Sequence, residues 1–512
     1  MTDPSHTHTV PSRGLINRRT FLAGTAGATV LAGLAGKGFQ RPASAAPAIP
    51  AADRDPLDLL QRMLRFDTQN FGEGGQTLEH AKMLKAVWDN AGVEAEIVPT
   101  PMAGNVHLIA RVKGTGTEKP LLLLGHSDVV PVEKENWSVD PFAAEVVDGE
   151  IFGRGALDMK GANAAFVAAL LRHLSEGHQF DRDIVVLTDA DEEAGPHGSN
   201  WLVKERPELL EASMVLTEGG WFLAQSDGTT PMLTSMTRQD KLYFNLDLVA
   251  KGTATHSSKP IPDAAIVRLS RAVDKLGDWK GKVTLTDVTR EYFAALAGAS
   301  SNKRFARAIE LMLRERGGQD LLERHAAMVV KESDYPYLHE ALLRTTHSFV
   351  IADAGYKENV IPSTATCRVN CRGIPGGQKP REVYAEIKAL LADSDVEVRP
   401  IRADDKTEEE HWAELDAEWA TAPAAVDNKL VEGFRSATTA RYHGAKFTPA
   451  LFEAGTSLDP WRKKGIPGYG VYPYVIDNDQ LIGMHGNDER IATAALATGT
   501  DFMYDVFAKF VV

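Results

Sequence analysis

Short apolar segments alternate with helical periodicity in the first part of this chain, and this alternation limits the fold more than any other feature. Helical spacing at 56–66 and 77–91 precedes apolar runs of strand length, which lie at 106–112, 121–124, 184–187 and 214–216. Strands that are apolar throughout, with helices between them, are typical of a parallel sheet covered on both faces. The sequence therefore predicts an α/β fold with a mainly parallel sheet.

A different pattern begins at about residue 241. Residues 242–248 alternate apolar and polar side chains, as a strand does when one face of its sheet meets water. A chain of 512 residues is also longer than one hydrophobic core usually supports. We therefore expect a smaller α+β domain, residues 237–405, that interrupts a catalytic domain made of residues 46–236 and 406–512. Helical spacing at 290–345 predicts a helical insertion in this smaller domain.

The amino terminus has the features of an export signal. Arg18 and Arg19 precede an apolar stretch rich in glycine and alanine, which ends at Ala43-Ser44-Ala45. This pattern predicts that residues 1–45 are a twin-arginine signal peptide, cleaved near Ala45, and that the protein is periplasmic or secreted. An uncleaved membrane anchor is the alternative, and the glycines of the apolar stretch disfavour it. We expect no stable membrane span after cleavage.

Charge and cysteine content narrow the classes of function. The formal charge of −14 repels phosphate backbones, so nucleic acid is a poor candidate partner. The two cysteines, Cys367 and Cys371, stand four residues apart in an alternating run. On one strand they would lie about 13 Å apart, too far for a disulfide. Small-molecule or peptide chemistry fits this composition better.

Acids and a histidine follow three of the predicted strands. They are His126 and Asp128 after 121–124, Glu192 and Glu193 after 184–187, and Glu218 after 214–217. Open α/β sheets bind ligands beyond the carboxyl ends of their strands, so these side chains are expected to converge. Asp158 stands in a glycine-rich turn at 153–161, and Asp128 can orient the His126 imidazole. A lone histidine after a strand is more often a satisfied polar residue, and an Asp-Glu-Glu run is usually a solvated loop, but together these segments suit zinc or another divalent first-row metal.

The motifs His-x-Asp, Asp-x-Lys-Gly and Glu-Glu, in this order, resemble those of a known family. It is the family of two-zinc peptidases and deacylases that includes aminoacylase, acetylornithine deacetylase, succinyl-diaminopimelate desuccinylase and bacterial glutamate carboxypeptidase. The resemblance implies a zinc catalytic domain interrupted by a lid or dimerisation domain. It also implies two zinc ions, which Co²⁺ or Mn²⁺ can replace. The implied ligands are His126 and Glu218 for one ion, Glu193 and His485 for the other, and Asp158 as the bridge.

The same resemblance implies roles for residues outside the ligand set. Glu192 is the implied general base, and His256, in the segment 252–257, is the implied contact to the tetrahedral intermediate, usually supplied by a neighbouring subunit. A homodimer is therefore expected, although the helical insertion leaves this open. Asn359 and Arg372 match substrate-binding positions, and the Arg372 guanidinium suits a substrate carboxylate. A cis peptide is expected between Asp158 and Met159.

One position departs from the family pattern, since Ser457 stands where the family usually has an aspartate. The predicted function is cleavage of an amide bond in a peptide with a free carboxylate, as in a dipeptidase or carboxypeptidase. The alternative is a deacylase of N-acyl amino acids, which uses the same site. An inactive binding protein on the same fold is less favoured, because Glu192 and every ligand position are filled.

Overall fold

The computed structural model describes residues 47–512, so the predicted signal peptide at 1–45 lies outside the described residues. Within 47–512, no helix has the length and apolar character needed to cross a membrane.

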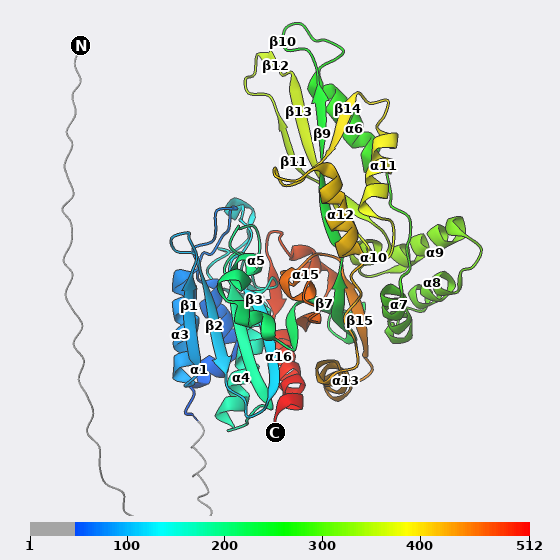
Figure 1. Cartoon of the computed structure of the whole chain (residues 1–512). Helices are drawn as coiled ribbons and strands as arrows, with labels where there is room; N and C mark the ends of the chain where they lie inside the picture. The colour runs from blue at the N-terminus through cyan, green and yellow to red at the C-terminus, as the bar shows by residue number, and fades with distance from the viewer. Residues whose placement is uncertain (1–46) are drawn as a thin grey trace, which may run out of the picture. The chain divides into compact units, whose positions relative to one another are not determined.

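A large sheet of eight strands organises most of this part of the chain, in the order β1-β2-β6-β3-β7-β16-β8-β15 (Figure 1). Its central strands β6, β3, β7 and β16 are parallel, and β1 and β2 run antiparallel to their neighbours. β8 runs antiparallel to β7 and β16 but pairs in parallel with the edge strand β15. The fold class is therefore the predicted one. The bounds are β1 (Glu94–Pro99), β2 (Val106–Val112), β3 (Glu118–His126), β6 (Arg182–Asp189), β7 (Met214–Ala224), β8 (Pro231–Asp240), β15 (Lys446–Phe452) and β16 (Gly468–Ile476).

The apolar run in β3 packs into a hydrophobic core on each face of the large sheet. Leu121 and Leu123 belong to one hydrophobic core, and Leu122 and Leu124 belong to another. Because successive side chains of a strand point to opposite faces, one run of leucines serves both cores. The helices around the sheet are α1 (Ala51–Arg54), α2 (Pro56–Leu64), α3 (Leu78–Asn90), α4 (Lys160–Ser175), α5 (Ser199–Glu205), α13 (Lys429–Arg441), α14 (Asp459–Arg462), α15 (Asn478–Gly483) and α16 (Thr493–Phe507).

A small antiparallel sheet forms the second core, in the strand order β11-β13-β9-β14. Cys367 and Cys371 face this core as free thiols, as predicted. The bounds are β9 (Leu242–Lys251), β11 (Thr346–Ala354), β13 (Thr364–Gly373) and β14 (Val396–Pro400), with α6 (Ala265–Gly277), α11 (Pro380–Leu390) and α12 (Glu408–Trp419) beside them. Trp412 and Leu415 place α12 on this core, although residues from 406 on were expected to belong to the catalytic domain.

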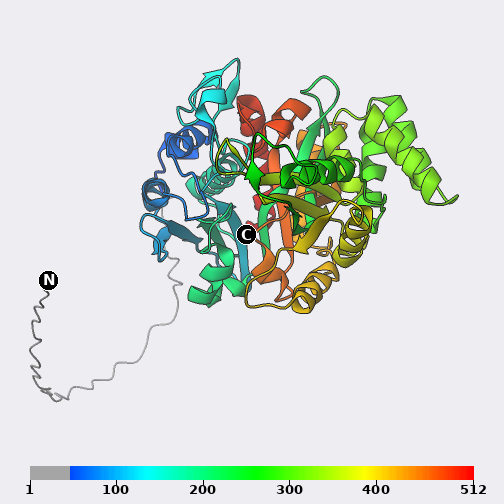
Figure 2. The ribbon, with the colours of Figure 1, turned by 90° about the horizontal axis from the view of Figure 1, so that it is seen from above.

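The helical segment expected as an insertion in the smaller domain packs elsewhere. It forms α7 (Asp287–Ala299), α8 (Lys303–Arg314), α9 (Gln319–Glu332) and α10 (Pro336–Leu343). Val288, Phe293 and Phe305 belong to the core of the large sheet, and the Tyr335 hydroxyl donates to carbonyls at the ends of β7 and β16. Figures 1 and 2 show these helices on the β15 side of the large sheet. They extend the core of the large sheet, because α7 packs on the edge strand β15 and the other helices follow it, α8 on α7, α9 on α8 and α10 on α9.

Two minor sheets complete the described strands. One joins β4 (Val146–Val147), β5 (Glu150–Phe152) and β17 (Arg490–Ala492), so that distant segments of the chain pair near the carboxyl edge of the large sheet. The other joins β10 (Thr255–His256) and β12 (Val360–Ile361).

Candidate metal centre

Three of the predicted ligands, His126, Glu193 and Glu218, come from adjacent parallel strands or from the loop that follows one of them. β3 ends at His126, the loop after β6 carries Glu192 and Glu193, and Glu218 lies in β7. Since β6, β3 and β7 are neighbours, their carboxyl ends meet at one edge of the sheet.

Asp158 lies between two donor pairs. Its Oδ1 is 3.2 Å from Nε2 of His126, which is itself 3.5 Å from Oε2 of Glu218. Its Oδ2 is 3.1 Å from Nε2 of His485, which is itself 3.4 Å from Oε1 of Glu193. Each carboxylate oxygen of Asp158 thus faces a different histidine and glutamate. All five predicted ligands are brought together, and the expected cis peptide between Asp158 and Met159 is present.

Tyr472 joins this cluster without having been predicted. Its hydroxyl oxygen lies 2.9 Å from Asp158 Oδ1 and 2.9 Å from Glu218 Oε2. The Tyr472 ring stacks on Trp221 at 4.5 Å, and both side chains are buried. The single Tyr472 hydroxyl therefore lies within hydrogen-bond distance of two carboxylates that face the same histidine.

The loop carrying Glu192 and Glu193 is held by Asp128. The backbone N–H groups of Glu192 and Glu193 donate to the Asp128 carboxylate at 3.2 and 3.0 Å, and the Asn70 amide donates to it at 2.8 Å. The sequence suggested that this carboxylate orients His126. Instead, the backbone carbonyl of Asp128 lies 2.8 Å from His126 Nδ1, and the carboxylate is farther away at 3.7 Å.

Glu192 lies beside the donors without sharing their closest contacts. A carboxylate oxygen of Glu192 lies within 4.8 Å of donor atoms of His126 and Glu218. The Ser457 hydroxyl donates to Glu192 Oε1 at 3.5 Å. Glu192 thus forms, with His126 and Glu218, a second group of side chains that could hold a metal ion.

Acid groups crowd a largely buried space, and their pKa values reflect it. Burial, with the neighbouring Asp158 carboxylate, raises the pKa of Glu218 to about 8. Burial and the charge of Glu218 likewise raise the pKa of Glu192. Burial also acts to raise the pKa of Asp158, but its bonds to His126 and His485 outweigh this effect and lower it. Such repulsion between acids is relieved by a cation.

The donor set fits a divalent metal. Glu193 Oε1 is buried without a hydrogen-bond partner, which leaves an acceptor directed at the cluster. Imidazole nitrogens and carboxylate oxygens are ligands of zinc and other divalent first-row metals. The His485 side chain is 46% exposed, so the cluster opens to solvent on that side.

Comparison with known proteins identifies the family. The model of "Peptidase family M20/M25/M40" matches residues 122–509, a span that contains all five predicted ligands. The chain belongs to peptidase family M20/M25/M40. It is accordingly a hydrolase that acts on amide bonds, as predicted.

Several proteins are similar to this M20 chain over most of its length. It is 25% identical over 468 residues to "Probable carboxypeptidase S-like 2" of Dictyostelium discoideum, covering 88% of this chain and 84% of that one. It is 26% identical over 404 residues to "N-fatty-acyl-amino acid synthase/hydrolase PM20D1" of Homo sapiens, covering 76% and 73%. The solved structure of the di-peptidase Dug1p from Saccharomyces cerevisiae superposes with a TM-score of 0.63 at 15% identity, covering 91% and 99%. The last likeness establishes the fold.

The residues predicted to meet substrate lie at opposite ends of the small sheet of this M20 chain. Arg372 lies near Gly455, two residues from Ser457, and its guanidinium packs over Tyr243 at 5.4 Å. His256 and Asn359 lie side by side instead at the β10–β12 end, where the Asn359 carbonyl accepts from Ser257 N–H. Both are exposed, and Figure 1 shows that end pointing away from the large sheet. The structure brings Arg372 to the metal side and leaves His256 and Asn359 apart from it.

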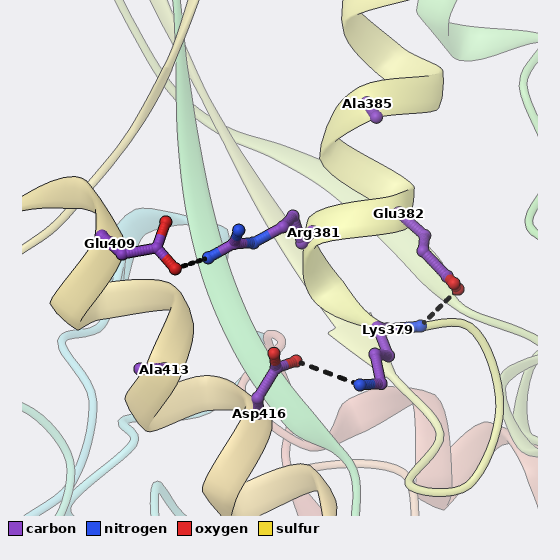
Figure 3. Close-up of a pocket in the computed structure, with 7 residues that line it drawn as sticks. All are labelled: Lys379, Arg381, Glu382, Ala385, Glu409, Ala413 and Asp416. Carbon is purple, nitrogen blue, oxygen red and sulfur yellow. Dashed lines mark hydrogen bonds and ion pairs between the residues drawn. The ribbon is translucent and has the colours of Figure 1, made fainter.

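A surface pocket of about 450 Å³ between α11 and α12 is separate from this centre (Figure 3). Four of its charged side chains form two pairs, Arg381 with Glu409 at 2.8 Å and Lys379 with Asp416 at 4.0 Å, and Glu382 accepts from the backbone N–H of Lys379. The lining contains none of the predicted ligands.

Proposed function

We propose that this M20-family chain is a two-zinc peptidase of the dipeptidase or carboxypeptidase type, acting on substrates with a free carboxylate. The position of Asp158 between two donor pairs is the main support. His126 and Glu218 would hold one zinc, Glu193 and His485 the other, and Asp158 both, with Co²⁺ or Mn²⁺ as substitutes. Direct metal analysis of the purified protein tests this assignment, with two equivalents per chain expected.

The proposed chemistry divides between the metals and Glu192. Bound zinc would act as a Lewis acid that polarises the scissile carbonyl and acidifies water. Glu192 would take the proton from the attacking water and pass it to the leaving nitrogen. Asp128 supports this role because its carboxylate accepts hydrogen bonds from the backbone N–H groups of Glu192 and Glu193 and so positions their loop.

Arg372 is the proposed partner of the substrate carboxylate. Its Nε donates to Asn370 at 2.9 Å, which leaves the two terminal nitrogens for a bidentate contact. Tyr243, 59% exposed, provides a flat surface beneath the guanidinium. A free carboxylate on the leaving amino acid is therefore part of the proposed specificity.

A deacylase of N-acyl amino acids is the second candidate, supported by the PM20D1 relative. Both reactions release an amino acid whose carboxylate can reach Arg372, so they share one site. Turnover of a dipeptide panel beside N-acetyl, N-succinyl and N-fatty-acyl amino acids tests the choice. Exclusive turnover of the acyl compounds would reject the peptidase.

We also propose that a homodimer supplies His256 across subunits and that residues 1–45 direct twin-arginine export. The exposure of His256, away from the cluster of its own chain, supports the first. Arg18 and Arg19 before the apolar stretch support the second. The mass in solution and the amino-terminal residue of the exported protein are the respective tests.

A further inference from the structure

The segments that carry Asp158 and His485 are joined by a short antiparallel pairing. β5, which leads into the Asp158 turn, pairs antiparallel with β17, which follows His485. Past the end of this pairing, Gly153 N–H donates to the Glu489 carbonyl at 3.0 Å. Two proposed ligands that are more than 300 residues apart thus depend on one local contact region.

Glu489 reaches from the His485 segment into the Asp158 turn. Its Oε2 accepts from Gly155 N–H at 3.0 Å, and its Oε1 accepts from the N–H groups of Leu157 and Asp158 at 2.8 and 2.9 Å. The Glu489 side chain is fully buried. A carboxylate that accepts several backbone N–H groups fixes the path of that backbone, here up to Asp158 itself.

Arg154 reaches in the opposite direction. Its Nη2 donates to the carbonyl of Gly486 at 2.9 Å and to that of His485 at 3.3 Å, while its Nη1 donates to Glu489 Oε2 at 2.6 Å. His485 has a φ of 60°, in the left-handed region that disfavours residues other than glycine. Arg154 therefore binds the carbonyls of a segment whose backbone is not in its preferred conformation.

We propose that Arg154 and Glu489 are positioning residues that set the affinity of the metal site formed by Asp158, Glu193 and His485. The Arg154–Glu489 clamp is reciprocal. Arg154 binds the segment that carries His485, and Glu489 binds the turn that carries Asp158. This inference rests on the proposed function and deepens it. Neither residue is a metal ligand.

A purely structural role is the competing explanation. Buried ion pairs often add little net stability, because desolvation offsets their attraction. A pair that served only the fold would change unfolding of the metal-free protein and leave metal affinity intact. The clamp instead predicts that metal affinity changes, because outer partners of metal ligands commonly contribute about 10- to 100-fold to binding.

The test uses the full chain with the variants Glu489→Gln and Arg154→Lys, and Glu150→Gln as the matched control. Glu150, in β5, joins the same two strands by accepting from Arg490 at 3.0 Å, but it accepts no hydrogen bond from the backbone of the Asp158 turn. Zinc affinity is measured by competition with a chelator, and the metal-free fold by circular dichroism and thermal unfolding. We expect one of the two zinc dissociation constants to rise about 10- to 100-fold in both clamp variants. The other constant should rise less, since that zinc shares Asp158 but not His485, and both constants should change less than about threefold in the control.

Three outcomes would overturn the clamp. They are unchanged zinc affinities in folded variants, an equal loss in Glu150→Gln, and unfolding of both metal-free variants, since the pair would then serve the fold. If the unmodified chain binds fewer than two zinc ions, the proposed function itself fails, and with it the site that the clamp serves.

Discussion

The Ser457 hydroxyl lies 3.5 Å from a carboxylate oxygen of Glu192. The family that the sequence resembles usually has an aspartate at this position. A serine places a neutral donor there, so Glu192 is not faced by another acid from that side. This contact distinguishes the surroundings of Glu192 from those of Glu193. A carboxylate oxygen of Glu193 faces His485 and Asp158.

Glu192→Gln is expected to retain both metals and to lower kcat about 100-fold or more, the usual contribution of general acid–base catalysis. The amide preserves shape but cannot accept the proton. Metal content and steady-state kinetics measure the two effects. In the matched variant Glu193→Gln metal should be lost, and the reverse pattern would show that the two roles are exchanged.

Arg372→Lys should lower kcat/KM about 10- to 100-fold for substrates with a free carboxyl terminus, because an ammonium cannot reproduce two parallel bonds. Carboxyl-amidated counterparts should lose far less. Equal losses on both substrate sets would remove Arg372 from carboxylate recognition. Tyr243→Phe is the control, since it keeps the flat surface beneath the guanidinium.

His256→Ala should lower kcat with little change in KM, because the imidazole is proposed to meet charge that develops in the transition state. Mixed dimers of a Glu192→Gln chain with a His256→Ala chain should recover up to about half the activity of an intact dimer, since one of the two sites receives both good residues. If verified mixed dimers show no recovery of activity, His256 does not act across subunits.

Glu453→Gln should change how stability depends on pH. Burial raises the pKa of Glu453 to about 7, although its Oε1 accepts from Trp221 Nε1 at 2.7 Å. In the unfolded chain the group ionises near its ordinary pKa, so between about pH 4.5 and 7 the unfolded state binds fewer protons and stability falls as pH rises. The loss amounts to at most about 3 kcal/mol. Denaturant unfolding at pH 5 and 7 measures it, and an equal pH dependence in Glu453→Gln would assign it to other groups.

The strands that carry the centre could be predicted because of how they are buried. Leu121 to Leu124 are apolar at every position, since both faces of β3 are covered, and such a run followed by His126 is visible in a sequence. Tyr472 was missed for the same reason, because β16 is buried throughout and a tyrosine there resembles any core aromatic. Only the fold shows that its hydroxyl points at two acids.

The placement of the 290–345 helices could not be predicted either. Periodicity identified the apolar faces of α7 and α8, but not the sheet that covers them. Phe293 and Phe305 would suit either core, and in the structure both belong to the core of the large sheet, whose edge strand β15 contacts α7.

The chain's two cysteines both lie in the small sheet, so their reactivity can report when the core of that sheet opens. Cys371 is fully buried and Cys367 is 4% exposed, both in the core behind β13, and burial raises the pKa of Cys371 to about 12. Since the thiolate is the reactive form, a thiol reagent should label either residue only when that core transiently opens. The core of the large sheet contains no cysteine. The labelling rate of the native protein would therefore report the opening of the small sheet alone, without any engineered probe.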